Sequence, residues 1–498
     1  MSEPRQLRVH ALFRLPELTE LPGVAAISRG DTATIDEIHY DTDDLRLFRW
    51  GVVLTRRQGG PDKGWRCAFP AEGFDGADDE LIFPDSKEVP AELRELLHPL
   101  TREQVLCPVA HLRTERTAYE LADESAEPVL ALLDDTVSIL DGKHVAARFR
   151  EIELVPLNPD AARGPLAQVV GDALQSLGAA PSVTTRAATA LGPRASAPPD
   201  VVESEAVLPE DPAGDAVRAH LAKHIRRFLV QDVRVRRDLP DSVHQMRVAA
   251  RRIRSGLRGF GPLVDAEWSK HLRDELGWIA GELGAVRDTE VMIERLDERA
   301  ADLPPDESDL AQTAVDRALS VRISDARAHA LGALRSERHH RLLVALVEAA
   351  ADPKLTESAR RSCTEALPPL VDKTWRRLAK DVDQLHLDSP AHPWHETRIA
   401  AKKARYSAEA VEPVFGRPAK DLVKALEQVT EILGDHQDAH VAQMTLKSLA
   451  AEPGMDAPTG FALGLLYALE VDYEMGLRRD FQRLWPKIVK SRTDNPLT

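Results

Sequence analysis

The chain has 498 residues, 43% of them hydrophobic and 29% charged, and its formal net charge is −16. These values are typical of a globular protein, and the length allows two or three domains. The three cysteines, Cys67, Cys107 and Cys363, form no CxxC pair, which argues against a disulfide framework or a thiolate zinc site and predicts a cytoplasmic location. No apolar run reaches the roughly 18 residues of a membrane span, and no apolar signal core follows the first residues, so no membrane partner is expected.

The first part of the sequence predicts a β-rich domain over residues 5–190. Short apolar segments separated by turn residues predict strands at 32–42, 50–60, 64–70, 114–122, 128–140 and 147–157. In the last segment, Glu151 and Glu153 alternate with Ile152 and Leu154, which is the period of a strand. Helical periodicity is visible only at 89–100 and 164–178. Many strands at short spacing predict an antiparallel sheet or barrel with a few flanking helices.

Residues 191–213 are rich in Pro, Ala, Ser and acids, and they predict a linker between domains. After the linker, apolar residues recur three and four positions apart, which predicts an all-α region and makes the fold class multidomain α+β. The first 200 residues hold 21 Lys and Arg against 33 Asp and Glu, whereas the remaining residues hold 44 against 48. The helical region is therefore close to balanced overall, and its bases are clustered.

The helical region repeats itself with an offset of 150 or 151 residues. Three pairs of segments share this offset: HxxRxxxRRxR at His244 with HxxRxxxKKxR at His395, LGAVRDTEV at Leu283 with LGDHQDAHV at Leu433, and IRRF at Ile225 with WRRL at Trp375. The repetition predicts an internal duplication, with two helical bundles at 214–350 and 351–492 related by a pseudo-twofold axis.

Each repeat carries basic residues along one face of a predicted helix. His244, Arg247, Arg251, Arg254 and Arg258 are spaced three, four, three and four, so they lie within an arc of roughly 80° on a helix. No acidic residue occurs between positions 242 and 264. Like charges on one narrow face repel one another unless an anion neutralises them. The pattern therefore predicts a surface that binds a polyanion.

Two plainer interpretations stay open. A charged run on a helix is commonly a solvated face, and a single histidine is commonly structural. The return of the run at the same phase in the second repeat favours binding. The residues predicted to bind the polyanion are Lys223, Arg226, Arg227, His244, Arg247, Arg251, Arg252, Arg254, Arg258, Lys373, Arg376, Arg377, His395, Arg398, Lys402, Lys403 and Arg405.

The side chains indicate which polyanion fits. Guanidinium groups match phosphate oxygens bidentately, and several in a row suit a repeating polyanion. The protein could instead be a nucleic-acid-binding module. Such modules usually interleave aromatic residues for base stacking, and these runs contain almost none. A ligand that carries a charge at every unit and is recognised through its backbone alone therefore fits better, and the sequence does not predict an oligomeric state.

The HxxRxxxRRxR and HxxRxxxKKxR helices, together with the paired LGxxxD segments, resemble the CHAD family over about residues 211–498. The resemblance implies a duplicated helical domain that binds inorganic polyphosphate along a basic surface or pore between its halves. It implies no required cofactor, and it implies recruitment to polyphosphate granules.

Residues 5–190 resemble the CYTH family through YDTDDLRLFRWGVVLTRRQGG, GWRCAFP and FREIELV. The resemblance implies an eight-stranded antiparallel β-barrel, or tunnel, that binds triphosphates with Mg²⁺ or Mn²⁺. The sequence departs from the family pattern: Arg8, His10 and Leu12 stand where the family has ExExK, Thr55 replaces an arginine, and Ala68 replaces a lysine.

The residues that remain imply a weakened tunnel. Arg57, Arg113 and Arg116 are predicted to form a residual anion site, and Glu151 and Glu153 are the candidate metal ligands. Without the opening pair of acids the tunnel loses much of the carboxylate charge on which Mg²⁺ binding depends. We expect no catalytic residues and a loss of triphosphatase activity. The alternative is an active metal-dependent triphosphatase whose helical region holds the substrate.

Overall fold

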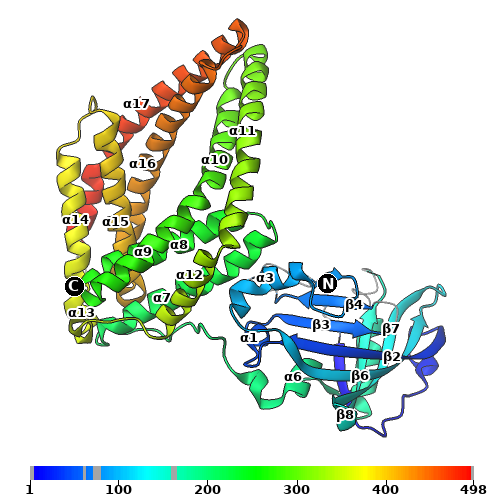
Figure 1. Ribbon diagram of the computed structural model, residues 1–498. Helices are drawn as coiled ribbons and strands as arrows, with labels where there is room; N and C mark the ends of the chain where they lie inside the picture. Colours follow the sequence, from blue (N-terminus) through cyan, green and yellow to red (C-terminus); the bar gives the residue numbers. More distant parts are fainter. Residues whose placement is uncertain (1–4, 60–62, 71–73, 75–79, 159–164, 495–498) are drawn as a thin grey trace. The chain divides into compact units, whose positions relative to one another are not determined.

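The structure is a computed structural model, and it describes residues 5–59, 63–70, 74, 80–158 and 165–494 (Figure 1). The ends of two predicted elements, Gly60 of the strand at 50–60 and Gly164 of the helix at 164–178, lie outside the described residues. The chain forms two compact units, Met1–Asp200 and Val201–Thr498, and the boundary between them in the sequence falls within the predicted linker. The finer domain boundaries within the helical region stay predictions.

The first unit contains one antiparallel sheet of nine strands in the order β5-β4-β3-β2-β6-β7-β8-β1-β9. The strands are β1 Arg5–Val9, β2 Ala26–Asp41, β3 Val53–Gln58, β4 Gly64–Ala68, β5 Glu80–Phe83, β6 Cys107–Ala122, β7 Pro128–Asp141, β8 His144–Pro156 and β9 Ala180–Pro181. The helices are α1 Arg46–Arg49, α3 Ala91–Thr101, α5 Leu166–Ser176 and α6 Arg186–Leu191. The prediction of an antiparallel sheet with flanking helices is confirmed.

The predicted barrel differs in its closure. The edge strands β5 and β9 have no ladder between them in the described residues, so the sheet is open. Both edge strands are short, four and two residues, and they offer few backbone groups for a closing ladder.

The alternation of side chains gives the sheet two different faces. Leu7, Ile152 and Leu154 pack in an apolar core that includes Val170 and Leu174 of α5. The residues between them along the strands face the other way and are charged. The predicted tunnel residues Arg57, Arg116, Glu151 and Glu153 lie on the charged face. Arg113 lies on the opposite face, because it is three positions from Arg116 on β6 with no bulge between them.

The second unit is helical. Its elements are α7 Ala213–Arg236, α8 Ser242–Gly259, α9 Ala266–Glu282, α10 Gly284–Ala300, α11 Pro305–Leu334, α12 Glu337–Ala351, α13 Cys363–Ala366, α14 Pro368–Asp383, α15 Ala391–Phe415, α16 Arg417–Ala450 and α17 Ala457–Asp494. Among the helices that the structure describes, none combines the length and apolarity needed to cross a bilayer.

The offset of 150 residues maps the helices of one repeat onto those of the other. Helix α7 corresponds to α13 and α14, and α8 corresponds to α15. The pair α9 and α10 corresponds to the single helix α16, and the pair α11 and α12 corresponds to α17. The duplication is therefore visible in the structure, although the first repeat breaks two helices that the second keeps continuous.

The two repeats share a hydrophobic core. Met292 and Leu296 of α10 and Val315 of α11 pack in one cluster with Leu446 of α16 and Leu463 of α17. The hairpins α10–α11 and α16–α17 accordingly lie side by side (Figure 1). Burial of this apolar surface holds the repeats together as one unit.

Candidate functional site

Helices α8 and α15, which carry the two predicted basic runs, pack against each other. On α8, Met246, Ile253 and Leu257 are buried, so the basic face turns away from the core of its own repeat. The guanidinium of Arg251 on α8 lies 5.4 Å from the ring centroid of Tyr406 on α15. The duplication therefore brings the two basic runs together at one place.

Acidic residues at equivalent positions of the two repeats act on equivalent arginines of the two helices. The guanidinium of Arg247 lies 2.9 Å from the carboxylate of Asp288 on α10. In the second repeat, the pKa of Arg398 is lowered by burial, and the largest opposing effect is the charge of Asp438 on α16. Both carboxylates are the final residues of the LGxxxD segments, so the sequence held a signal for them that the predicted site left out.

A cavity of about 410 Å³ opens between these helices, and we call it the basic cleft. Its wall contains eight basic side chains from α8, α9, α14 and α15, and no acidic residue lies among the residues that line it. The basic side chains are Arg251, Arg254, Arg258, Arg273, Lys373, Arg377, Lys402 and Lys403. All except Arg273 are predicted binding residues. Arg273 lies on α9, outside both basic runs, and only the packing of α9 reveals it.

Burial and mutual repulsion disfavour the charged forms of the bases in the basic cleft. Burial lowers the pKa of Lys402 to about 7, with further lowering by Arg398 and Arg251. Burial also lowers the pKa of Arg254, and Arg258 and Arg273 lower it further. A lowered pKa in a base means that the protein disfavours its charged form. An anion in the cleft would restore the balance.

The second basic run contains one of the buried side-chain atoms that make no hydrogen bond within the described part of the chain. The Nε atom of Arg398 is inaccessible to solvent and makes no hydrogen bond. A buried unpaired donor costs about 1–3 kcal/mol. Arg398 is not among the residues that line the basic cleft, so its predicted contact with the anion stays a prediction.

The histidines that begin the two runs are half-buried. The imidazole Nδ1 of His395 lies 2.7 Å from Oε1 of Gln437. Burial lowers the pKa of His244, and Asp241 opposes this effect. Neither histidine lines the basic cleft, so their predicted contact with the anion stays a prediction.

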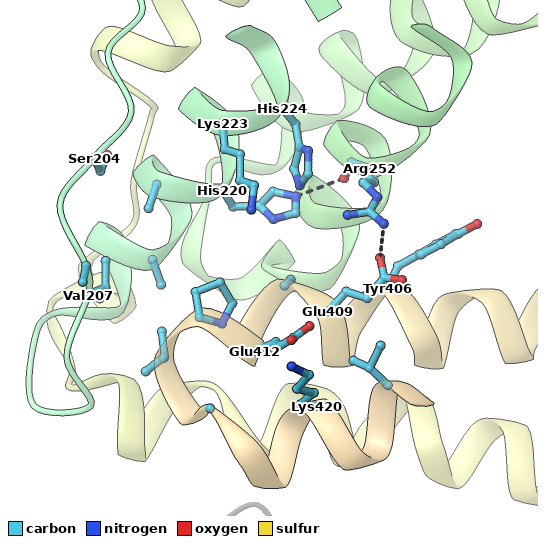
Figure 2. Close-up of a pocket in the computed structure, with 18 of the residues that line it drawn as sticks. Ser204, Val207, His220, Lys223, His224, Arg252, Tyr406, Glu409, Glu412 and Lys420 are labelled. Atoms are coloured by element: carbon cyan, nitrogen blue, oxygen red, sulfur yellow. Dashed lines mark hydrogen bonds and ion pairs between the residues drawn. The ribbon is translucent and has the colours of Figure 1, made fainter. Parts of the chain in front are cut away.

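Three predicted residues line a different cavity of about 940 Å³, shown in Figure 2. Lys223, Arg252 and Arg405 lie there among the carboxylates of Glu409 and Glu427 and several other acids. Arg252 approaches Glu409 at 3.4 Å, and Arg405 approaches Glu409 at 2.9 Å and Glu427 at 2.6 Å. The predicted binding residues are therefore divided between two cavities, one lined by bases and the other by bases together with acids.

The remaining predicted side chains are occupied locally. Arg226 donates to the backbone oxygen of Val201 at 3.3 Å, and Arg227 donates to the side chain of Gln245. Arg376 donates to the backbone oxygen of Asp372 at 3.3 Å. Arg377, at the edge of the basic cleft, also forms an ion pair with Asp381 at 3.0 Å.

In the first unit, each predicted anion-binding arginine is paired with a carboxylate. Arg57 lies 2.6 Å from Glu37, Arg113 lies 3.1 Å from Asp36, and Arg116 lies 2.7 Å from Asp135. Burial alone would raise the pKa of Glu37, but Arg57 lowers it below its usual value. The expected residual anion site is therefore neutralised by the protein itself.

The candidate metal ligands are held in the same way. Arg8, where the family pattern has an acid, lies 3.0 Å from the buried carboxylate of Glu151, and Arg186 of α6 lies 2.8 Å from it. Glu153 lies 3.9 Å from Arg186. In the described residues, no three or more ligating side chains gather in a group that could hold a metal ion. The metal site stays a prediction, and this arrangement gives it no support.

Comparison with known proteins assigns the helical unit to a family. The sequence pattern of the CHAD domain matches residues 219–447. The uncharacterized proteins MT2285 and Rv2226 of Mycobacterium tuberculosis are 30% identical over 521 residues, covering 98% of this chain and 97% of theirs. The chain belongs to the CHAD family. The CHAD match begins within α7 and ends within α16, so it contains both helices of the basic cleft.

Solved structures resemble each half of the chain. PptA from Streptomyces chartreusis is 27% identical, covers 55% of this chain and 100% of its own, and has a TM-score of 0.48. HpAC1 from Hippeastrum, reported to have a dominant triphosphatase activity, is 15% identical, covers 38% of this chain and 97% of its own, and has a TM-score of 0.23.

Proposed function

We propose that the protein binds inorganic polyphosphate in the basic cleft between α8 and α15. The observation that carries the proposal is the wall of the cleft, which holds eight basic side chains and no acidic ones. CHAD domains are associated with polyphosphate binding, and the proposal agrees with membership of that family.

The chemistry of the wall favours a chain of phosphates over other anions. A polyphosphate carries a negative charge at every unit, and arginine binds phosphate oxygens through two parallel hydrogen bonds. Arg251, Arg254 and Arg258 follow one another along α8 at helical spacing, so they can contact successive units. Tyr406 is the one aromatic residue in the wall, which is too few for base stacking along a nucleic acid.

The experiment replaces Arg251, Arg254, Arg258 and Lys402, which all line the basic cleft, with Ala and measures the affinity for long-chain polyphosphate. We expect a loss of at least a hundredfold, since each charge-assisted hydrogen bond contributes about 1.5–3 kcal/mol. Wild-type affinity should fall steeply with salt, because binding releases the counterions condensed on the polyanion. Circular dichroism checks that the helices remain.

A matched control changes the charge by the same amount elsewhere. Arg341, Arg360, Arg361 and Arg483 are exposed and lie outside the basic cleft. Replacing these four with Ala should change the affinity by less than about threefold, because they contribute only to the long-range field. Equal losses in the two variants would refute the cleft as the site, and stronger binding of RNA than of polyphosphate would favour a nucleic-acid module.

We also propose that the first unit does not hydrolyse triphosphate. The support is the pairing of its remaining carboxylates with Arg8, Arg116 and Arg186, which removes the negative charge that a divalent cation needs. On this proposal the polyphosphate-binding function needs no metal cofactor.

A further inference from the structure

Lys402 occupies an unusual place in the basic cleft. It lies near the middle of α15, it is half-buried, and it forms no ion pair within the described part of the chain. Arg398 of the same helix and Arg247 and Arg251 of α8 act on it from close range. In the wall of the cleft, the half-buried ammonium group shares one cavity with the guanidinium groups of Arg251, Arg254 and Arg258.

The charged groups on the neighbouring helices do not cancel this repulsion. Asp438 of α16 opposes it, and Asp288 of α10 is already bound to Arg247 at 2.9 Å. The groups that face the same cavity from α8, α9, α14 and α15 are Arg254, Arg258, Arg273, Lys373, Arg377, Lys403 and Tyr406. The other cavity shares Tyr406 with the cleft and contains the bases His220 and Lys223. Its acids Glu409 and Glu427 are paired with arginines, Glu409 with Arg252 and Arg405, and Glu427 with Arg405. The surroundings of Lys402 remain strongly positive.

The chemistry of the cluster singles out the lysine. A guanidinium group keeps its proton at any pH a protein meets, whereas an ammonium group can lose one when it is desolvated and repelled. The pKa of Lys402 is lowered to about 7 by burial, Arg398 and Arg251. In the empty cleft, Lys402 is therefore the group that relieves the repulsion by becoming neutral.

We infer that polyphosphate binding is coupled to the uptake of one proton, which is transferred from solvent to Nζ of Lys402. The inference rests on the proposed function of the basic cleft. An anion beside Lys402 replaces repulsion by attraction, so the charged ammonium becomes the favoured form in the complex. The bound phosphate chain and the proton thus stabilise each other, and each must raise the affinity for the other equally.

The sign of the pH dependence follows. Below about pH 7 the lysine of the free protein is already charged, so binding takes up only a small fraction of a proton. Above that pH the free protein must first gain a proton, so the affinity falls as the pH rises. Between about pH 6.5 and 8.5 the binding constant should fall on the order of tenfold, if the complex keeps the proton throughout.

The test is calorimetric titration of the full chain with long-chain polyphosphate at about pH 7.5. Chain ends that titrate near neutral pH are scarce in long polyphosphate. Repeating the titration in buffers with different ionisation enthalpies gives the number of protons exchanged, from the slope of observed enthalpy against buffer enthalpy. We expect an uptake of roughly 0.7 proton, given a pKa near 7 in the free protein.

Three variants locate the proton. Lys402→Arg keeps the charge but cannot lose it, so the uptake should fall to near zero. Lys402→Gln imitates the neutral form and should likewise remove the uptake, which covers the case in which the arginine does not fit. His244→Gln removes the one histidine of α8, and the uptake per bound polyphosphate should remain even if this variant changes the affinity.

The outcomes separate the inference from the function beneath it. Wild-type protein that binds no polyphosphate at any pH would overturn the proposed function. Binding with an enthalpy independent of the buffer would overturn the proton coupling alone. Uptake that survives both Lys402 variants, or that vanishes in His244→Gln, would place the proton elsewhere and overturn the assignment to Lys402.

Discussion

Arg254 and Arg405 occupy equivalent positions in the two repeats, 151 residues apart, yet their surroundings are opposite. Arg254 lines the basic cleft beside Arg258 and Arg273 and forms no ion pair within the described residues. Arg405 lines the other cavity, where Glu409 and Glu427 neutralise it. The same side chain is therefore available to an anion in one repeat and structural in the other.

This asymmetry predicts different consequences for Arg254→Gln and Arg405→Gln. The first should weaken polyphosphate binding about tenfold and leave stability unchanged or slightly higher, because it removes one contact and some repulsion. The second should leave the affinity within about twofold and lower the free energy of unfolding by about 1 kcal/mol, because Glu409 and Glu427 lose their partner.

Affinity titrations and urea unfolding of the two variants measure both quantities. A larger loss of affinity in Arg405→Gln than in Arg254→Gln would contradict the separation of the two cavities.

The sequence contained part of this distinction. No acid occurs near Arg254 along α8, whereas Glu409 follows Arg405 by one helical turn and favours a local ion pair. Glu427 lies on α16, and only the packing of α16 against α15 brings it to Arg405. Helical spacing predicts which residues share a face, but it does not predict what the next helix places opposite them.

At the scale of the elements, α8 is fixed against α7 by the ring of His220, which packs over Gly256. His220 of α7 places Nε2 3.1 Å from the backbone oxygen of Arg252 and donates to it. A Cβ atom at Gly256 would lie 2.2 Å from this ring nitrogen. The ring is also enclosed by His224 and Phe260, with centroids at 4.5 and 5.6 Å, so it has little room to move.

Gly256→Ala should therefore destabilise the helical unit by about 1–3 kcal/mol, although alanine is normally the better helix former. The control is Gly434→Ala in α16, where no heavy atom lies within 4 Å of the added Cβ. That variant should be stabilised by roughly 0.5–1 kcal/mol. Thermal and urea unfolding compare the two, and equal effects would show that the His220 contact does not hold α8 in place.

The helices themselves were predicted from apolar periodicity and the repeat, and the two basic runs do lie on helices. The breaks were not predictable. The same Leu-Gly pair lies at the break between α9 and α10, where Leu283 separates the helices and Gly284 begins α10, but it stays inside α16 at Leu433 and Gly434. The flanking residues and the tertiary packing decide the outcome, because one glycine costs a helix only about 1 kcal/mol.

At the scale of the whole molecule, the two units treat charge in different ways. In the first unit, Arg8, Arg116 and Arg186 are paired with the buried carboxylates of Asp135 and Glu151. In the second unit, the basic cleft collects positive charge without an acid in its wall. Comparison with the family pattern revealed from the sequence that acids are missing in the first unit. The pairing of the remaining acids could be seen only in the structure, which places Arg8 of β1 opposite Glu151 of β8.

This arrangement predicts that the full chain releases no phosphate from inorganic triphosphate above background, with either Mg²⁺ or Mn²⁺. The carboxylates that could bind the metal ion are held by arginines, and breaking a buried ion pair costs about 3–5 kcal/mol. A colorimetric phosphate assay with and without metal measures the rate. Metal-dependent hydrolysis at enzyme-like rates would establish the alternative of an active triphosphatase.

The common core of Met292, Leu296, Leu446 and Leu463 joins segments that lie more than a hundred positions apart in the sequence. Each repeat supplies one wall of the cleft and one side of this core. Either repeat by itself would therefore expose a large apolar surface to water. Cleavage of the chain in the connection between α12 and α13 would yield two fragments that reassemble by complementation. Once separated, each fragment would lose both its solubility and its ability to bind the ligand.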